Sequence, residues 1–283
     1  MTDDITVFTG SAHPQFAEEM CQILGVELSP THITRFSNDC LQVQLRANCR
    51  RRDVYIVQPL VPPVQENLVE LLLMLDAARG ASAAHITAVI PHYSYARSDK
   101  KDAPRISIGG KLVADMLSAA GATRVITMTL HSEQVHGFFN VPVDHLTAVR
   151  VLADHFKEKD LSNTVVVSPD FGYAKVASQF ARLLDLDVAA GSKRRMADDT
   201  VVIDRIVGDV EGKNAIIIDD EIATAGSMIE LMDRLQEERV KNISLACTHG
   251  LFTGKAVERL NARQDITEIV TTSTVPLTPQ RTP

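Results

Sequence analysis

The sequence predicts an α/β protein built from parallel sheets. Short runs of apolar and β-branched residues alternate with longer amphipathic stretches along all 283 residues. Several runs are apolar without alternation, which is typical of strands buried on both faces of a parallel sheet. Because the two kinds of segment alternate, we expect doubly wound α/β architecture with right-handed crossovers.

The predicted elements follow from these patterns in chain order. Strands are expected at residues 5–8, 54–57, 86–90, 125–128, 164–167, 215–218, 243–246 and 266–270. A helix is predicted wherever apolar residues recur at i, i+3, i+4 and i+7. This spacing is found in Leu68, Leu71, Leu72 and Leu75, and again in Met228, Leu231, Met232 and Leu235. A further helix is expected over 171–185.

One segment departs from the alternation of strands and helices. Residues 32–46 read as a β-hairpin around Ser37-Asn38-Asp39, projecting from the main sheet of the first domain.

A weak internal repeat indicates a duplicated domain. Ile90-Pro-His-Tyr-Ser-Tyr-Ala-Arg97 aligns with Ser168-Pro-Asp-Phe-Gly-Tyr-Ala-Lys175, and each copy directly follows a predicted strand. Open α/β sheets bind ligands at the carboxyl ends of their strands. We therefore expect two domains, 1–147 and 148–283, and chance similarity is the competing explanation of the repeat.

Composition excludes several classes of protein. With 45% hydrophobic residues and a net charge of −7, the chain has the composition of a folded globular protein, not of a disordered one or of a broadly basic nucleic-acid binder. Its four cysteines form no CxxC pair, which indicates reduced thiols and not a zinc site or disulfide framework. The start of the chain is acidic and no apolar run is long enough to span a membrane. A cytoplasmic location is expected.

The strongest local signal is the run from Ala215 to Ser227. A predicted buried strand ends in Asp219 and Asp220, and a turn of small residues then opens a helix. Backbone N–H groups of the turn, with the hydroxyls of Thr224 and Ser227, suit a phosphate at the helix N-terminus. The two carboxylates suit sugar hydroxyls or a metal ion. The alternative is that one aspartate merely caps the helix.

The run Asp219-Asp-Glu-Ile-Ala-Thr-Ala-Gly-Ser227 resembles the phosphoribosyl-binding loop of the phosphoribosyltransferase fold. Further segments, in order, resemble the ribose-phosphate pyrophosphokinase (PRPP synthetase) family. They are Arg35-Phe-Ser-Asn38, Tyr95-Ala-Arg-Ser-Asp-Lys-Lys101, Gly121-Ala-Thr-Arg-Val-Ile-Thr-Met128, Leu130-His131, Gly137-Phe-Phe-Asn-Val-Pro-Val-Asp144, Ser168-Pro-Asp170 and Lys193-Arg-Arg195. The resemblance implies two tandem phosphoribosyltransferase-like domains, each a mostly parallel sheet flanked by helices.

The resemblance also implies the reaction. ATP and ribose 5-phosphate would give 5-phosphoribosyl 1-diphosphate (PRPP) and AMP with Mg²⁺, by attack of the anomeric hydroxyl on the β-phosphorus. Two alternatives remain open, namely a non-catalytic regulatory subunit associated with PRPP synthetase and a PRPP-consuming phosphoribosyltransferase.

Site residues carry over from the family position by position. Ribose 5-phosphate would be bound by Asp219, Asp220, Thr224, Ala225, Gly226 and Ser227, and Mg²⁺ by His131 and Asp170 across an interdomain cleft. Lys193 and Arg195 match cations of a mobile catalytic loop. ATP would contact Phe36, Asn38, Arg97, Asp99 and Lys100, with the hairpin pair reaching the adenine of a neighbouring subunit in a homo-oligomer, from dimer to hexamer. The competing assignments are a packed His131, a helix-capping Asp170, a solvated basic turn at 193–195 and a hairpin-core Phe36.

Three positions depart from the family pattern. Ala223, Ser98 and Cys40 stand where the family usually has Asp, Gln and Glu, which puts nucleotide affinity and identity in question. Members of the family normally continue with a further strand and helix after the position of the proline-rich segment 275–283. The cluster of three arginines at 50–52 reads as a solvated basic patch, with an anion site as the alternative.

Overall fold

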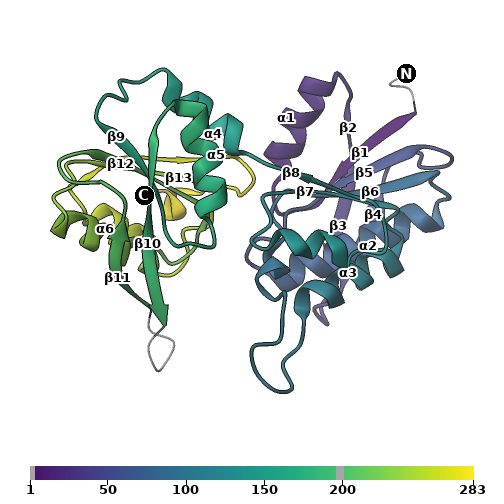
Figure 1. The fold of residues 1–283 in the computed structure, drawn as a ribbon. Coiled ribbons are helices and arrows are strands. Elements are labelled where there is room, and N and C mark those ends of the chain that lie inside the picture. Colours follow the sequence, from purple (N-terminus) through teal and green to yellow (C-terminus); the bar gives the residue numbers. More distant parts are fainter. Residues whose placement is uncertain (1–3, 196–200) are drawn as a thin grey trace. The chain divides into compact units, whose positions relative to one another are not determined.

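The chain folds into two compact units (Figure 1). This computed structural model describes residues 4–195 and 201–283, and for residues 193–195 and 201–202 it describes the backbone alone. The first unit comprises the chain up to Leu146 together with Thr274–Pro276. The second comprises Thr147–Ser273 and Leu277–Pro283.

The first unit is a parallel sheet with helices on both faces. Its strand order is β2-β1-β5-β6-β7-β8, and each neighbouring pair is parallel. The strands are β1 (Ile5–Thr9), β2 (Leu28–Ser29), β5 (Asp53–Val57), β6 (His85–Ile90), β7 (Arg124–Met128) and β8 (Val143–Leu146). The helices are α1 (Pro14–Leu24), α2 (Val64–Gly80) and α3 (Gly109–Ala120), with short 3₁₀ helices η1 (Ser94–Arg97) and η2 (Glu133–Phe138). The strands β3 (Thr31–Arg35) and β4 (Leu41–Leu45) form a separate antiparallel hairpin, as predicted.

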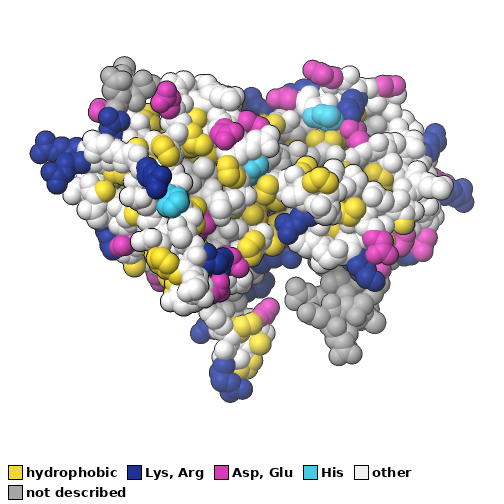
Figure 2. All heavy atoms as spheres, turned by 180° about the vertical axis from the view of Figure 1, so that it is seen from behind, with side chains coloured by type: hydrophobic (Ala, Val, Ile, Leu, Met, Phe, Trp, Pro, Cys, Tyr) yellow, Lys and Arg dark blue, Asp and Glu magenta, His cyan; other side chains and the backbone are white. Residues whose placement is uncertain are grey.

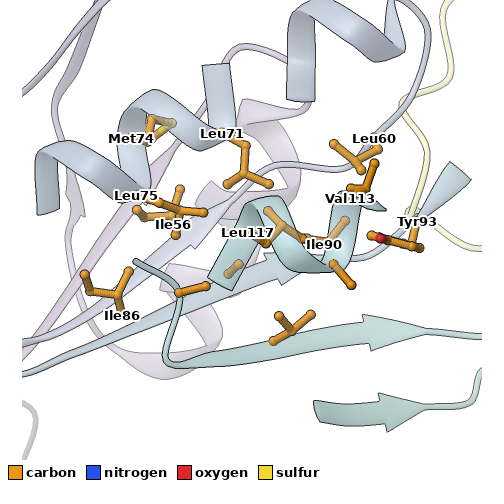
Figure 3. Close-up of a cluster of buried hydrophobic side chains, with 14 of the residues drawn as sticks. Ile56, Leu60, Leu71, Met74, Leu75, Ile86, Ile90, Tyr93, Val113 and Leu117 are labelled. Atoms are coloured by element: carbon orange, nitrogen blue, oxygen red, sulfur yellow. The ribbon is translucent and has the colours of Figure 1, made fainter. Parts of the chain in front are cut away.

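The sheet of the first unit is buried on both faces, which explains its non-alternating apolar strands. On one face, Ile56 and Ile90 of the sheet belong to the same buried cluster as Leu71 of α2 and Leu117 of α3 (Figure 3). On the other face, a smaller cluster of buried side chains joins the sheet to α1. Its members are Val7, Ala17, Cys21, Val57 and Val89.

The second unit repeats this plan. Its strand order is β11-β10-β9-β12-β13-β14, and among the ladders described in this sheet the pair β10 and β11 alone is antiparallel. The strands are β9 (Thr164–Ser168), β10 (Asp187–Arg195), β11 (Val201–Val207), β12 (Asn214–Ile222), β13 (Ile243–Gly250) and β14 (Ile266–Thr271). The helices are α4 (Val149–Lys157), α5 (Ala174–Leu184), α6 (Gly226–Glu237) and α7 (Ala256–Asn261), with a short 3₁₀ helix η4 (Pro279–Arg281). The rings of Phe156 in α4 and Phe180 in α5 meet edge to face with centroids 5.9 Å apart, and Leu231 of α6 packs with Ile217.

The duplication is visible in the topology. In each unit the first strand is flanked on one side by the second strand and on the other by the later parallel strands, so β1, β5, β6 and β7 correspond to β9, β12, β13 and β14. The sequence repeat does not follow this correspondence. Its first copy leaves β6 and its second leaves β9, which are not equivalent strands. The repeat was therefore wrongly attributed to the duplication, although both copies do lie at carboxyl ends of strands.

The predicted fold class is confirmed, and several elements differ from the prediction in their presence or their boundaries. All eight predicted strands are present. The short β2 and β8 were not predicted, because two to four residues carry too little pattern to read. The helix predicted over 171–185 begins only at Ala174. The strand predicted to end at residue 218 continues to Ile222, because β13 pairs with it along that whole stretch.

Within the described part of the chain, no helix is both long enough and apolar enough to span a bilayer. The four cysteines are free thiols, with Cys40 exposed and the others buried. Figure 2 shows apolar side chains at the surface among charged ones, and exposed large examples include Ile23, Leu112 and Val151.

A close backbone approach in the second unit generates the first prediction. A Cβ placed on buried Gly191 of β10 would lie 2.7 Å from the carbonyl oxygen of Pro169, which is backbone and cannot rotate away. Gly191→Ala should therefore destabilise the protein by about 1–3 kcal/mol, measured by thermal unfolding. Gly80→Ala is the matched control, because nothing lies within 4 Å of its Cβ position in helix α2. A Gly191→Ala protein that melts with the wild type would contradict this packing.

Candidate functional site

The candidate site of the second unit is built on β12. The pairing of β12 with β9 ends at Ile217, which lies opposite Val167. The pairing of β12 with β13 continues further, through Asp219 opposite Cys247 to Ile222 opposite Gly250. The sequence had suggested that the acidic pair lies at the end of the strand. In the structure the pair lies within the strand, which continues to Ile222. Since β9 is shorter, this end of β12 borders the turn that follows β9.

Burial and neighbouring charge perturb the acidic pair. Asp220 is only 5% exposed, and its backbone N–H donates to Asp219 Oδ1 at 2.9 Å. Burial raises the pKa of Asp219 well above its usual range, and the negative charges of Asp220 and Asp170 raise it further. A strongly perturbed carboxyl with an identifiable charged partner is typical of functional sites. These oxygens suit ligands that bring hydrogen-bond donors or positive charge.

Asp170 lies in the turn between β9 and α5. Ser168 Oγ donates to the carbonyl of Asp170 at 2.7 Å, and the N–H of Tyr173 donates to Asp170 Oδ1 at 3.2 Å. The N-cap of α5 is Tyr173, so Asp170 orders the turn and is not the cap that the alternative assignment expected. Because β9 and β12 pair in parallel, their carboxyl ends lie at the same edge of the sheet, and the charge of Asp170 contributes to raising the pKa of Asp219.

The turn from Ala223 to Ser227 follows β12 and opens α6. Its N-cap, Ala225, has φ 58° and ψ 8° in the left-handed region, and no side chain of the described residues caps the helix. The first-turn N–H groups of a helix have no partner within the helix, so they are available to an anion. Thr224 and Ser227 are exposed beside them, while Ala225 is buried.

An unpredicted side chain holds this turn. Arg259 of α7 donates from Nη1 to the carbonyl oxygen of Thr224 at 2.8 Å. No motif in the sequence pointed to this arginine, because it lies in an ordinary amphipathic segment 35 residues away.

Lys193 and Arg195 lie at the end of β10. Their backbone pairs antiparallel with Ile203 and Val201 of β11, so it belongs to the strand. Their side chains, and residues 196–200, lie outside what the structure describes.

In the first unit, Arg97 and His131 follow neighbouring parallel strands. Arg97 ends η1 after β6, and His131 follows β7 by three residues; both are exposed. Asp99 and Lys100 lie in the segment between η1 and α3. The structure thus brings Arg97 and His131 to the side of the sheet where β6 and β7 end, and Asp99 and Lys100 lie in the loop beyond η1.

Phe36 and Asn38 lie apart from them, on the hairpin turn. Phe36 is 47% exposed, so it is not a buried hairpin-core residue. Asn38 Oδ1 accepts the N–H of Cys40 at 3.3 Å. Arg35 forms ion pairs with Asp39 and with Glu66 of α2, which fastens the hairpin to the first unit.

Two of the departing residues have structural roles. Ser98 Oγ accepts the N–H of Gly109 at 2.8 Å and donates to the carbonyl of Ser107 at 3.3 Å, so it closes the base of the segment that carries Asp99 and Lys100. The carbonyl of Ala223 accepts the N–H of Thr253 at 2.9 Å. Cys40 is exposed, and nothing in the structure explains its departure from the family pattern.

The metal-ligand expectation rests on single residues and not on a cluster. Among the described residues, no group of three or more His, Cys, Asp or Glu side chains is arranged to hold a metal ion. His131 and Asp170 belong to different units.

Known proteins match this chain over nearly its whole length. The family model for the N-terminal domain of ribose phosphate pyrophosphokinase matches residues 5–121, and the model for the phosphoribosyl synthetase-associated domain matches residues 201–282. A protein of Streptomyces coelicolor is 65% identical over 97% of this chain and 86% of its own. The ribose-phosphate pyrophosphokinase of Deinococcus radiodurans is 50% identical over 98% of this chain and 86% of its own. The crystal structure of phosphoribosylpyrophosphate synthetase from Mycobacterium smegmatis superposes with a TM-score of 0.92 at 36% identity, covering 99% of this chain and 92% of that one.

The fold and the carboxyl-edge turn define a protein of the phosphoribosyltransferase-like α/β class with two tandem domains. The sequence relatives narrow this class. The chain belongs to the ribose-phosphate pyrophosphokinase family.

The half-buried His145 of β8 accepts a hydrogen bond from the backbone beside His131. The N–H of Leu130 donates to His145 Nε2 at 2.9 Å, so this nitrogen must be unprotonated. Burial lowers the pKa of His145, and of its charged neighbours Glu133 raises it while His136 lowers it further. Below the ordinary value of 6.5 the unfolded chain therefore takes up a proton that the folded chain refuses, and stability falls.

We expect the melting temperature of the wild type to drop more between pH 7.5 and about 5.5 than that of His145→Gln, whose amide oxygen accepts the same bond without titrating. His85→Gln, at an exposed histidine that begins β6 and does not act on His145, should keep the wild-type pH dependence. Equal losses in the wild type and His145→Gln would show that His145 plays no such role.

Proposed function

We propose that this chain transfers the diphosphate of ATP to the anomeric hydroxyl of ribose 5-phosphate, giving PRPP and AMP for nucleotide biosynthesis. Family membership supports the class of reaction. The observation that supports a sugar-phosphate site is the carboxyl edge of the second unit, where the acidic pair of β12 is followed, after a short turn, by a helix N-terminus that no described side chain caps.

The sugar site follows from these two features. The N–H groups of the turn Thr224–Ser227 and the hydroxyls of Thr224 and Ser227 would bind the 5-phosphate. Asp219 and Asp220 would accept hydrogen bonds from the ribose hydroxyls, and such donors would stabilise the charged form of Asp219, which burial and the neighbouring carboxylates disfavour. A phosphate at one end and hydroxyls at the other fix the direction of the sugar.

Mg²⁺ would be held by Asp170 and His131. Mg²⁺ prefers oxygen ligands and keeps several waters, so one or two protein ligands suffice. The mutual repulsion of Asp170 and Asp219 fits such an ion, because a divalent cation would relieve it. When bound, the ion would neutralise charge on the phosphate oxygens of ATP.

The ATP side is proposed for the first unit. Arg97 and Lys100 would contact the phosphates, Asp99 lies between them in sequence, and the exposed ring of Phe36 would stack on adenine while the Asn38 amide binds the base edge. In the family, the hairpin serves a neighbouring subunit, so we also propose a homo-oligomer. The cytoplasmic location expected from the sequence stays a prediction.

The chemical step is a displacement at the β-phosphorus. The anomeric oxygen forms a bond to that phosphorus, the bond to the α-phosphate oxygen breaks, AMP leaves with that oxygen, and the hydroxyl proton is released to solvent. Such transfer needs alignment and charge stabilisation more than covalent chemistry. Lys193 and Arg195 would place positive charge on the transferring group.

Product analysis tests the assignment. Purified protein given ATP, ribose 5-phosphate and millimolar Mg²⁺ should form AMP and PRPP only when the sugar phosphate is present. Release of pyrophosphate from added PRPP, with a base as acceptor, would identify a phosphoribosyltransferase instead. Neither reaction, with binding to an active PRPP synthetase, would identify a non-catalytic regulatory subunit.

Lys193 generates a kinetic prediction. Because its charge acts mainly in the transition state, Lys193→Ala should lower kcat by about 10²-fold or more while the KM for ribose 5-phosphate changes little. The control is Lys213→Ala, which removes a cation just before β12 begins, at the opposite end of the strand. A Lys193→Ala enzyme with wild-type turnover would remove this residue from the mechanism.

A further inference from the structure

Arg259 contacts the phosphate turn from a separate element. Its Nη1 donates to the carbonyl oxygen of Thr224 at 2.8 Å, and a Cβ placed on Gly226 would lie 3.4 Å from the same nitrogen. The guanidinium of α7 therefore lies beside both the carbonyl that precedes the N-cap of α6 and the first residue of that helix.

This hydrogen bond fixes the direction of a neighbouring N–H group. In a trans peptide the carbonyl of one residue and the N–H of the next point in opposite directions. Holding the Thr224 carbonyl against Arg259 therefore turns the Ala225 N–H away from Arg259.

Ala225 adopts the conformation that this arrangement requires. Its φ of 58° lies in the left-handed region, which a residue with a Cβ adopts only against a steric cost. Rotation of the 224–225 peptide would relieve that cost and reverse the N–H. The bond from Arg259 opposes this rotation.

The charge of Arg259 is also unusual for its position. The N-terminus of a helix carries partial positive charge and favours acidic residues, yet the first turn of α6 contains none and a guanidinium lies beside it. Two positive groups side by side are unfavourable until an anion joins them. A phosphate dianion would offset both.

We infer that Arg259 is a positioning residue for the 5-phosphate of ribose 5-phosphate, acting through the Thr224–Ala225 peptide. The inference rests on the proposed function. It adds a residue outside the phosphate turn, contributed by α7, to the specificity for a phosphorylated sugar.

Steady-state kinetics separates this role from a general structural one. Arg259→Ala should raise the KM for ribose 5-phosphate roughly tenfold or more, as expected for a lost hydrogen bond from a charged donor. The KM for ATP and the melting temperature without ligand should stay near the wild type. Arg259→Lys, which keeps a cationic donor, should recover part of the loss. Lys255→Ala is the matched control, since it removes the same charge just before α7 begins and should leave the KM unchanged.

A double variant tests the conformational mechanism. Glycine adopts the left-handed region readily, so Ala225→Gly added to Arg259→Ala should restore part of the affinity for ribose 5-phosphate. Absence of any recovery would overturn the positioning role, because Arg259 would then act by its charge alone.

A binding measurement distinguishes this inference from the proposed function. Ribose 5-phosphate without ATP should raise the melting temperature of the wild type and raise that of Arg259→Ala much less. An active wild type with an Arg259→Ala variant of unchanged KM and unchanged thermal shift overturns the inference alone. A wild type that forms no AMP and is not stabilised by ribose 5-phosphate refutes the proposed function, and the inference with it.

Discussion

The parallel pairing of β9 with β12 is the constraint on which the candidate site depends. It places the turn after β9 beside the last residues of β12, so that Asp170 acts electrostatically on Asp219. Keeping charge in this half-buried place is unfavourable, and for that reason burial and the neighbouring carboxylates raise the pKa of Asp219. The fold holds the carboxylates there because the strands below them are locked between two apolar layers. A ligand that brings hydroxyl donors or a cation would stabilise the charged carboxylates. Binding of such a ligand should therefore stabilise the folded second unit.

The two units show how one topology accommodates two chemistries. At the position of β12, the first unit has β5, which is followed by Gln58 and not by an acidic pair. Gln58 is buried and donates to Glu70 Oε1 at 2.8 Å, so this strand end is used for internal structure. The exposed cation and imidazole of the first unit follow β6 and β7 instead. Both units therefore place candidate side chains at the carboxyl ends of parallel strands. The first unit uses the ends of β6 and β7, and the second uses the ends of β9 and β12.

Much of the fold could be predicted from the sequence, because burial on both faces leaves an apolar signature that needs no tertiary information. The boundaries of strands were less predictable, since β12 continues through two aspartates only because β13 accompanies it. Which residues distant in the sequence lie side by side in the structure could not be predicted from the sequence. The Pro-x-aromatic repeat looked like duplication until the sheet order separated β6 from β9, and Arg259 carried no signal because its partner is a backbone carbonyl 35 residues away.

The central claim is that the carboxyl edge of the second unit holds the sugar phosphate. A crystal structure of the protein with bound ribose 5-phosphate tests it most directly. The account predicts the phosphate on the N–H groups of residues 224–227 and the ribose hydroxyls on Asp219 and Asp220. A sugar phosphate bound elsewhere, with this turn vacant, would contradict it.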